Sequence, residues 1–126
     1  MPHTPASMAI IVKKDGEGDT TAMMQAQAEK YLGNLLTPDR ISNLKQSLND
    51  VFGGRGKASG AYTFAGQPVL HASSGNMQKS VTLFFYMSGV NAKIFAMGQH
   101  KTSSSYTVSE YGQRGTDFQL GKTVSL

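Results

Sequence analysis

The chain has 126 residues, of which 39% are hydrophobic and 16% charged, and its formal net charge is +4. This length fits one domain, residues 1–126, with a single compact core. The sequence has no cysteine, which excludes disulfides and thiolate metal sites. No apolar run reaches the length of a membrane span and no signal-peptide pattern is present, so no span is expected.

The positive charge is concentrated in the second part of the chain. Residues 1–52 carry five Lys or Arg against six Asp or Glu, a net −1, whereas residues 53–126 carry seven against two, a net +5. Such an asymmetry indicates a polyanionic partner such as RNA, DNA or an acidic protein. A basic, solvated surface without a partner explains the same distribution equally well.

The N-terminal part is predicted to be loose at first and then helical. Residues 1–19 are predicted to form a loose segment, although Ala9–Val12 is also compatible with a short strand or an apolar cover of the core. A helix is predicted to begin at Asp19, Thr20 or Thr21, which are all favourable N-caps. Its apolar face at helical spacing consists of Met24, Ala28, Tyr31 and Leu35.

A second helix is predicted directly after the first. Thr37 is the expected N-cap, Pro38 takes the first helical position, and Gly53-Gly54 ends the helix. Its apolar face consists of Ile41, Leu44, Leu48 and Val51. Because the link between the two helices is short, residues 20–52 are predicted to form a helical hairpin.

Residues 61–126 are predicted to form an antiparallel sheet around one central hairpin. This hairpin joins Ser80–Met87 to Ala92–Met97 through a Gly/Asn turn. The other predicted strands are 61–65, continued by 69–71 after an interruption at 66–68, then 106–111 and 118–126. The predicted class is α+β: an N-terminal helical hairpin packed on a four- or five-stranded antiparallel sheet, whose other face is open to solvent or a partner.

The candidate chemistry lies in the basic part of the chain. RNA is cleaved without a metal when a base deprotonates the 2′-hydroxyl, an acid protonates the leaving 5′-oxygen and cations stabilise the added charge. The candidate catalytic residues are His100, His71, Lys101, Tyr106 and Arg114. The candidate substrate-binding residues are Lys79, Thr102, Ser103, Ser105, Thr107, Arg55 and Lys57. Regular strand alternation places His100 and Lys101 on opposite sides, unless a bulge at Gly98 changes this.

Other kinds of site are disfavoured. The stretch Gly53–Gly60 lacks the Gly-Lys-Ser/Thr order and the strand–loop–helix context of a phosphate-binding loop, and a mobile linker is expected there. A serine hydrolase is disfavoured because there is no G-x-S-x-G motif and no identifiable acid to orient a histidine. Neither H-E-x-x-H nor a Cys/His cluster is present, so neither a metal nor another cofactor is expected.

The central hairpin carries a resemblance to a known family. The apolar strand Val81–Tyr86 (VTLFFY), a short turn, and a second apolar strand that runs into Gly and His-Lys in Ala92–Lys101 (AKIFAMGQHK) resemble the RelE branch of the barnase/EndoU/colicin/RelE ribonuclease toxins. The order of elements, two helices and then a sequential sheet, is similar as well. The resemblance implies a toxin that cuts RNA in the cytoplasm of a bacterial cell, either from a toxin–antitoxin pair or delivered as the C-terminal part of a secreted contact-dependent inhibition protein.

The resemblance also implies a partner, an acidic immunity protein or antitoxin that covers the cleft. Only Arg55 and Arg114 are arginines in the basic part, fewer than in typical ribosome-dependent members, which favours free RNA such as tRNA. Two alternatives stay open. One is a non-enzymatic nucleic-acid-binding module, for which Tyr62, Phe64, Phe84 and Tyr86 are candidate base-stacking residues. The other is a structural or adaptor subunit of a secretion or phage particle.

Overall fold

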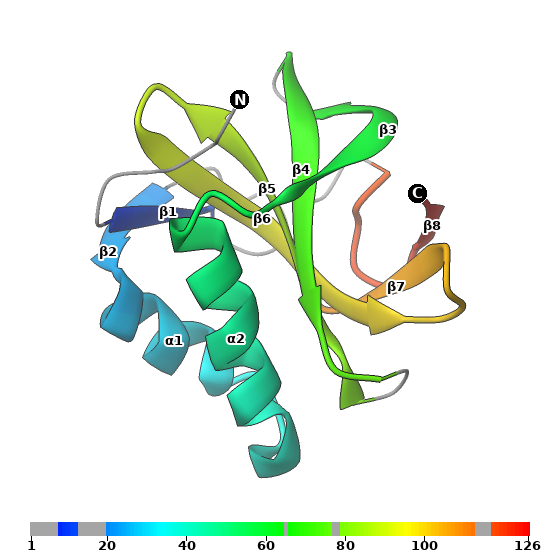
Figure 1. The fold of residues 1–126 in the computed structure, drawn as a ribbon, viewed down its shortest axis with the longest axis horizontal. Coiled ribbons are helices and arrows are strands. Elements are labelled where there is room, and N and C mark those ends of the chain that lie inside the picture. Colours follow the sequence, from blue (N-terminus) through cyan, green and yellow to red (C-terminus); the bar gives the residue numbers. More distant parts are fainter. Residues whose placement is uncertain (1–7, 13–19, 65, 77–78, 113–116) are drawn as a thin grey trace.

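The computed structural model describes residues 8–12, 20–64, 66–76, 79–112 and 117–126. In chain order its elements are β1 (Met8–Val12), β2 (Thr20–Met24), α1 (Gln25–Gly33), the 3₁₀ helix η2 (Pro38–Arg40), α2 (Ile41–Phe52), β3 (Lys57–Phe64), β4 (Gln67–Ser74), β5 (Val81–Ser88), β6 (Asn91–His100), β7 (Ser105–Gly112) and β8 (Thr123–Ser125). The α+β class is confirmed, because both α-helices lie on one side of a curled sheet (Figure 1). No helix in these ranges is long and apolar enough to cross a membrane.

The described strands form one eight-stranded sheet instead of the predicted four or five strands. Its order is β2-β1-β6-β5-β4-β3, with β7 paired to β6 and β8 paired to β7. All neighbours are antiparallel except β1, which runs parallel to β6. One edge of β6 is therefore shared, since residues 92–94 pair with β1 and residues 96–100 pair with β7. This sharing lets the sheet diverge at β6 and curl.

Two of the additional strands come from the segment that was predicted to be loose or helical. β1 pairs antiparallel with β2, so residues 1–19 contain a strand, and the first helix begins at Gln25 instead of at positions 19–21. Thr20 and Thr21 are β-branched and favour extended backbone. Pairing with the apolar strand β1 outweighs their preference for the N-cap position.

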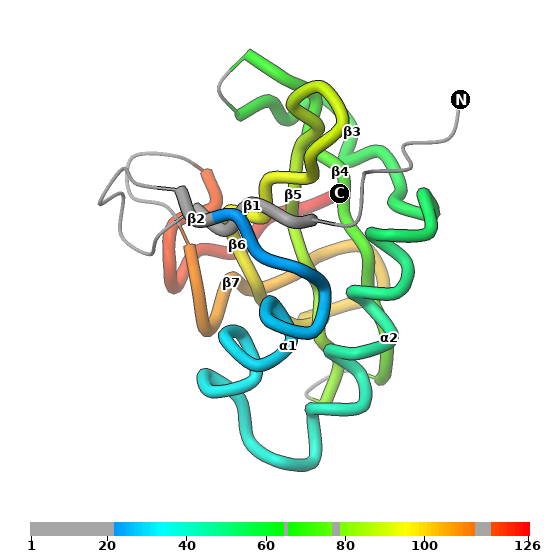
Figure 2. The backbone as a smooth tube through the Cα atoms, turned by 90° about the vertical axis from the view of Figure 1, so that its left-hand side faces the viewer, coloured from blue at the N-terminus to red at the C-terminus, as the bar shows by residue number. Residues whose placement is uncertain are grey.

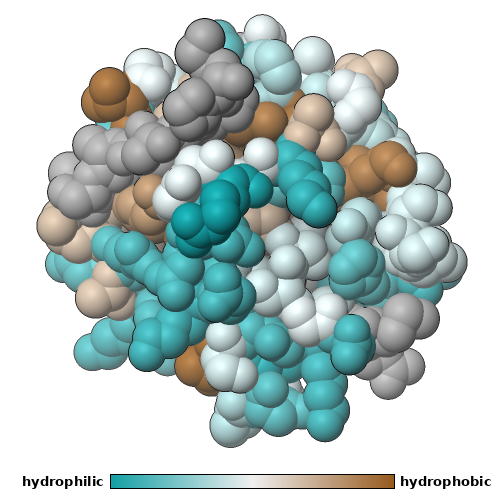
Figure 3. Space-filling view, in the orientation of Figure 1, coloured by the Kyte–Doolittle hydropathy of each residue, from teal (hydrophilic) through white to brown (hydrophobic). Residues whose placement is uncertain are grey.

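The two helices contribute to one core beneath the sheet, and their outer faces are largely hydrophilic (Figures 1 and 3). The predicted face of α2 is confirmed, since Leu44, Leu48 and Val51 are fully buried. The predicted face of α1 is confirmed at Ala28 and wrong at its other three positions. Its buried residues are Ala28 and Leu32, whereas Met24, Tyr31 and Leu35 are exposed. The cause is the length of α1, because Met24 belongs to β2 and Leu35 follows the helix end.

The sequence predicted that the sheet face turned away from the helices is open to solvent or a partner. In the structure this face is covered. A register shift between β5 and β6 leaves Phe95 as an extra residue. Phe95 and Ala96 therefore both face a second core, while Ile94 and Met97 face the helices. Alternation along β6 is thus interrupted at Phe95. The other members of the second core are Val69, Phe84, Tyr86, Tyr106, Val108, Phe118 and Val124. The curl of the sheet encloses these side chains, so the domain has two cores instead of one.

The boundaries of the remaining predicted strands move as well. β3 begins at Lys57, so half of the expected Gly-rich linker is strand. The predicted strand 118–126 is reduced to β8, and its alternation is interrupted. Phe118 and Val124 are buried, but Leu120 is 41% exposed. In the tube view of Figure 2, β5 and β6 run through the centre of the molecule, with α2 on one side.

Tyr111 is fully buried in the core beneath the helices, and its hydroxyl has no hydrogen-bond partner among the described residues. Burial raises the pKa of this phenol, so the group stays neutral but loses its water. Tyr111→Phe is expected to increase the free energy of unfolding by about 1 kcal/mol in urea titrations. Tyr31→Phe, at an exposed phenol, is the control and should change it by less than about 0.5 kcal/mol. A clear loss of stability in Tyr111→Phe would contradict the absence of a partner.

Candidate functional site

Six of the candidate residues line one pocket of about 370 Å³. These residues are His71, His100, Tyr106, Arg55, Lys57 and Ser103. Asp50, Ala72 and Ser73 complete the lining. The pocket therefore joins the C-terminal end of α2 and the start of β3 to the middle of β4 and the turn between β6 and β7. Segments that are far apart in the sequence meet there through the pairings β3–β4, β4–β5, β5–β6 and β6–β7.

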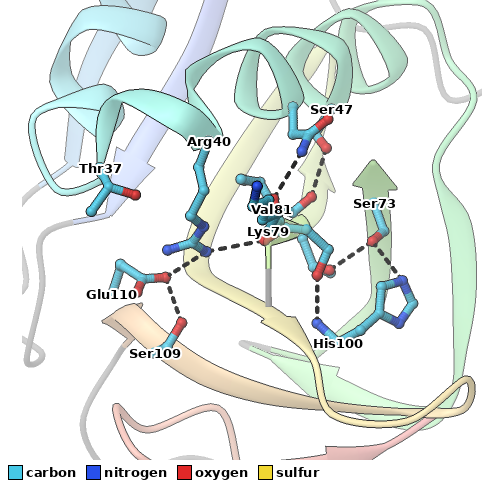
Figure 4. Close-up of polar contacts among 12 residues, drawn as sticks. Thr37, Arg40, Ser47, Ser73, Lys79, Val81, His100, Ser109 and Glu110 are labelled. Carbon is cyan, nitrogen blue, oxygen red and sulfur yellow. Dashed lines mark hydrogen bonds and ion pairs between the residues drawn. The ribbon is translucent and has the colours of Figure 1, made fainter. Parts of the chain in front are cut away.

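His100 ends β6 and is held at both ring nitrogens. Its Nε2 lies 3.1 Å from Ser73 Oγ, and its Nδ1 lies 3.2 Å from the backbone oxygen of Thr102. Its backbone N–H donates to Ser80 Oγ at 2.7 Å. Ser73 Oγ lies in turn 2.8 Å from Thr82 Oγ1. A row of hydroxyls thus leads from the buried Thr82 to the imidazole, and Figure 4 shows its last link.

The turn that supplies the Thr102 carbonyl is itself held by hydrogen bonds. The backbone N–H groups of Lys101 and Thr102 both donate to the carbonyl of Ser105, at 2.9 and 3.1 Å. The hydroxyls of Thr102 and Ser105 lie 2.7 Å apart. The Leu126 N–H donates to the carbonyl of Ser104 at 2.8 Å. These bonds give the carbonyl beside His100 a defined position.

The helices η2 and α2 fix the segment around Ser80 that leads into β5. Three successive carbonyls there accept side-chain hydrogen bonds of 2.7 to 3.0 Å: Lys79 from Asn43, Ser80 from Arg40 and Val81 from Ser47 (Figure 4). Arg40 Nη2 also lies 3.0 Å from Glu110 Oε1. Glu110 reaches it because Ser109 and Glu110 are two extra residues in the register between β6 and β7. This partly buried contact is therefore linked, through Ser80, to the backbone of His100.

His71 belongs to β4 and is only 9% exposed. Its Nδ1 lies 2.9 Å from the hydroxyl of the buried Ser59. Burial lowers the pKa of His71, and the nearby charges of Lys57 and His100 lower it further. The imidazole is therefore neutral at pH 7, which is the protonation state that a general base requires.

The lowered pKa of His71 predicts how stability depends on pH. The unfolded chain takes up a proton near the ordinary value of 6.5, whereas the folded chain does so only at lower pH. Stability contributed by the neutral, buried ring is therefore complete above pH 6.5 and is lost as the pH falls toward the folded-state pKa. In urea titrations at pH 7.0 and about 5.5, His71→Gln should show a smaller acid-induced loss than the unmodified protein. Equal losses would contradict this assignment.

The ring of Tyr106 contacts both histidines. Its centroid lies 4.4 Å from that of His100 and 5.6 Å from that of His71. Burial raises the pKa of the Tyr106 phenol, so this hydroxyl keeps its proton at neutral pH. Tyr106 thus spaces the two imidazoles and adds a neutral hydroxyl to the same wall of the pocket.

Arg55 and Lys57 provide the positive charge of the pocket. Arg55 Nε lies 2.9 Å from Asp50 Oδ1, and its Nη2 donates to the carbonyl of Asn49 at 3.0 Å. The Arg55 side chain is 57% exposed, so part of its guanidinium faces solvent. Lys57 is exposed at the start of β3, opposite His71 in the β3–β4 register. The two cations lie where an anionic group entering the pocket would meet them.

The other candidate residues do not line the pocket. Lys101, Thr102 and Ser105 lie in or beside the β6–β7 turn, Thr107 lies within β7, and the Lys79 side chain is exposed. Arg114 lies outside the described residues. The structure thus brings together His71, His100 and Tyr106 but not Lys101. His100 enters the second-core side of the sheet, while Lys101 is exposed after the strand end.

The aromatic residues that were considered for base stacking lie in the second core. Phe84 is fully buried and Tyr86 is 7% exposed, while Tyr62 and Phe64 pack against them from β3. Their rings contact one another and other core rings. These residues therefore do not form an exposed stacking platform on the sheet.

Ser73, Ser59 and Asp50 are parts of the site that sequence reasoning missed. Each is a common polar residue with no motif around it. Ser73 and Ser59 become important only because the register places them beside a histidine. Strand alternation offered one usable signal, since Ser73 and His71 are two residues apart in β4 and share a face. Among the described residues, no three His, Cys, Asp or Glu side chains gather closely enough to hold a metal ion.

Comparison of the chain with known protein families, with characterised proteins and with solved structures finds no significant match.

Proposed function

We propose that this protein is a metal-independent ribonuclease toxin. The observation that carries the proposal is the convergence of His71 and His100, with Lys57 and Arg55, on one pocket. Two imidazoles supply the base and the acid that transfer of a 2′-hydroxyl onto the adjacent phosphate requires. Two cations stabilise the additional negative charge of the pentavalent phosphorus.

The environments of the two histidines favour His71 as the general base and His100 as the general acid. His71 is buried and its pKa is lowered, so it accepts the proton of the 2′-hydroxyl. His100 is more exposed and, once protonated, donates from Nε2 to the leaving 5′-oxygen. The neutral phenol of Tyr106 lies beside both rings. Lys57 and Arg55 bind the phosphate oxygens in this scheme.

The substrate and the biological context follow from the charge of the chain and from its resemblance to ribonuclease toxins. The net charge of +4 is modest, which favours a free, compact RNA such as tRNA. We propose that the protein acts in the cytoplasm of a bacterial cell, where it is delivered as the C-terminal part of a secreted protein or released from a toxin–antitoxin pair. An acidic immunity protein or antitoxin, complementary to the basic pocket, would neutralise it.

The test is incubation of the purified protein with total cellular RNA in the presence of EDTA, followed by a gel that separates tRNA from rRNA. Discrete new bands are expected in the tRNA region. The double variant His71→Ala/His100→Ala, purified in parallel, should produce none, which controls for contaminating nucleases. Saturable RNA binding without cleavage would replace this proposal with a binding module. Neither binding nor cleavage would favour a structural subunit.

A further inference from the structure

The side chains of Ser73 and His100 form a hydrogen bond that has no role in the proposed RNA cleavage. Ser73 Oγ lies 3.1 Å from His100 Nε2, and both side chains line the pocket. The opposite ring nitrogen, Nδ1, lies 3.2 Å from the carbonyl oxygen of Thr102. Figure 4 shows the contact between Ser73 and the imidazole at the pocket end of β4 and β6.

The proton positions follow from the chemistry of these partners. A carbonyl oxygen only accepts hydrogen bonds, so His100 Nδ1 carries a proton and donates it to Thr102. In the neutral imidazole, Nε2 then has a lone pair, and the Ser73 hydroxyl donates to it. Thr82 Oγ1, 2.8 Å away, is left to donate to Ser73 Oγ. The Ser73 proton is thereby directed at a base.

We propose that Ser73 is a nucleophile activated by His100, with the Thr102 carbonyl as the group that orients the imidazole. The expected absence of an orienting acid had argued against a serine hydrolase. In the structure a backbone carbonyl performs the orienting step, and the hydrogen-bonded turn holds that carbonyl in place. The nucleophile Ser73 thus contacts the base His100, and the base contacts the carbonyl that orients it, as an activated serine requires. The inference does not depend on RNA cleavage.

The reaction class is hydrolysis of a carboxylic ester. Ser73 Oγ bonds to the acyl carbon, and its proton passes to His100 Nε2. The bond from the acyl carbon to the leaving oxygen breaks, and that oxygen takes the proton from Nε2. Water then attacks the acyl group and gives a proton to Nε2, which returns it to Ser73 as the acid is released. No oxidant, reductant or other reactant is needed.

The lining of the pocket selects among esters. Lys57 and Arg55 are cationic, and Asp50 is engaged with Arg55 at 2.9 Å. An ester that carries a carboxylate or a phosphate is therefore favoured over a neutral one. Hydrolysis of 4-nitrophenyl hemisuccinate should exceed that of 4-nitrophenyl acetate, and Lys57→Gln should reduce this ratio.

The test is labelling of the purified chain with a small fluorophosphonate, scored by intact mass and by peptide mapping, with no RNA present. Ser73 Oγ is expected to displace fluoride and to carry one adduct. Ser73→Ala should remove the adduct, and His100→Gln should slow labelling by a factor of about 10²–10⁴. Ser42→Ala, at an exposed serine of α2 that does not line the pocket, is the control and should label at the unmodified rate.

An adduct on any residue other than Ser73 overturns the inference, and so does no adduct on the folded, unmodified chain. Mapping the unmodified chain makes this outcome independent of whether any variant folds. Because labelling is measured without RNA, it also separates the two proposals. Intact RNA together with a Ser73 adduct would remove only the ribonuclease. Cleaved RNA without an adduct would remove only the activated serine.

Discussion

Replacing His100 with alanine is expected to lower the rate of RNA cleavage by a factor of about 10²–10⁴. The variant loses the proposed acid at Nε2, and the imidazole that remains, His71, is buried with its pKa lowered and so would not supply a proton at pH 7. The measurement is the initial rate of appearance of tRNA fragments at saturating enzyme, compared with the unmodified protein at the same pH.

The matched control is Gln99→Ala, at the preceding residue of β6, which is not part of the pocket lining. It removes a polar side chain from the same strand end, so it tests for local distortion and should cleave at a rate within about threefold of the unmodified protein. If His100→Ala is folded by thermal melting and cleaves as fast as this control, His100 is not the acid.

The central hairpin was predictable because the residue types of its strands and the residues of its turn both favour a β-hairpin. Apolar and β-branched residues run on both sides of a Gly-Val turn, and β5 and β6 form where they were expected. The N-terminal strands were not predictable in the same way. Thr20 and Thr21 satisfy the pattern of a helix start, and only pairing with a distant strand decides against it. The parallel contact of β1 with β6 spans about eighty residues and leaves no local trace.

The site was partly predictable for a related reason. Residue type identified His71, His100, Tyr106, Arg55 and Lys57 as candidates, because few side chains suit acid–base and phosphate chemistry. Their convergence depends on the register of strand pairs that are distant in the sequence, which periodicity does not reveal. The extra residue Phe95 changes which side chains of β6 face the second core. Alternation is regular from Ala96 to His100, so His100 shares the second-core side with Ala96, and the pairing of β6 with β7 places Tyr106 beside it.

The partly buried ion pair Arg40–Glu110 is expected to affect both the stability of the fold and the position of His100. Arg40 and Glu110 side chains are 9% and 18% exposed, and Arg40 also donates to the Ser80 carbonyl. The hydroxyl of the same Ser80 accepts the backbone N–H of His100. A substitution in the ion pair should therefore change the position of the His100 imidazole as well as the stability of the fold.

Glu110→Leu is expected to lower the free energy of unfolding by about 3 kcal/mol, because it leaves the buried Arg40 guanidinium without its carboxylate. Arg40 Nε has no hydrogen-bond partner among the described residues, so the guanidinium would retain the neutral Ser80 carbonyl as an acceptor but no opposite charge. Arg40→Met should cost less, about 1–2 kcal/mol, since the Glu110 carboxylate is more exposed and keeps the Ser109 hydroxyl as a donor.

The double variant Arg40→Met/Glu110→Leu separates the loss of a contact from the burial of a lone charge. Replacing both partners with apolar side chains should recover most of the stability lost in Glu110→Leu, because no charge is then left unpaired. Urea titrations of the four proteins give the coupling free energy. Additive losses would show that the pair is solvated and contributes little. RNA cleavage by the double variant should still be reduced, since the Ser80 carbonyl has lost the Arg40 hydrogen bond that helps to fix it beside His100.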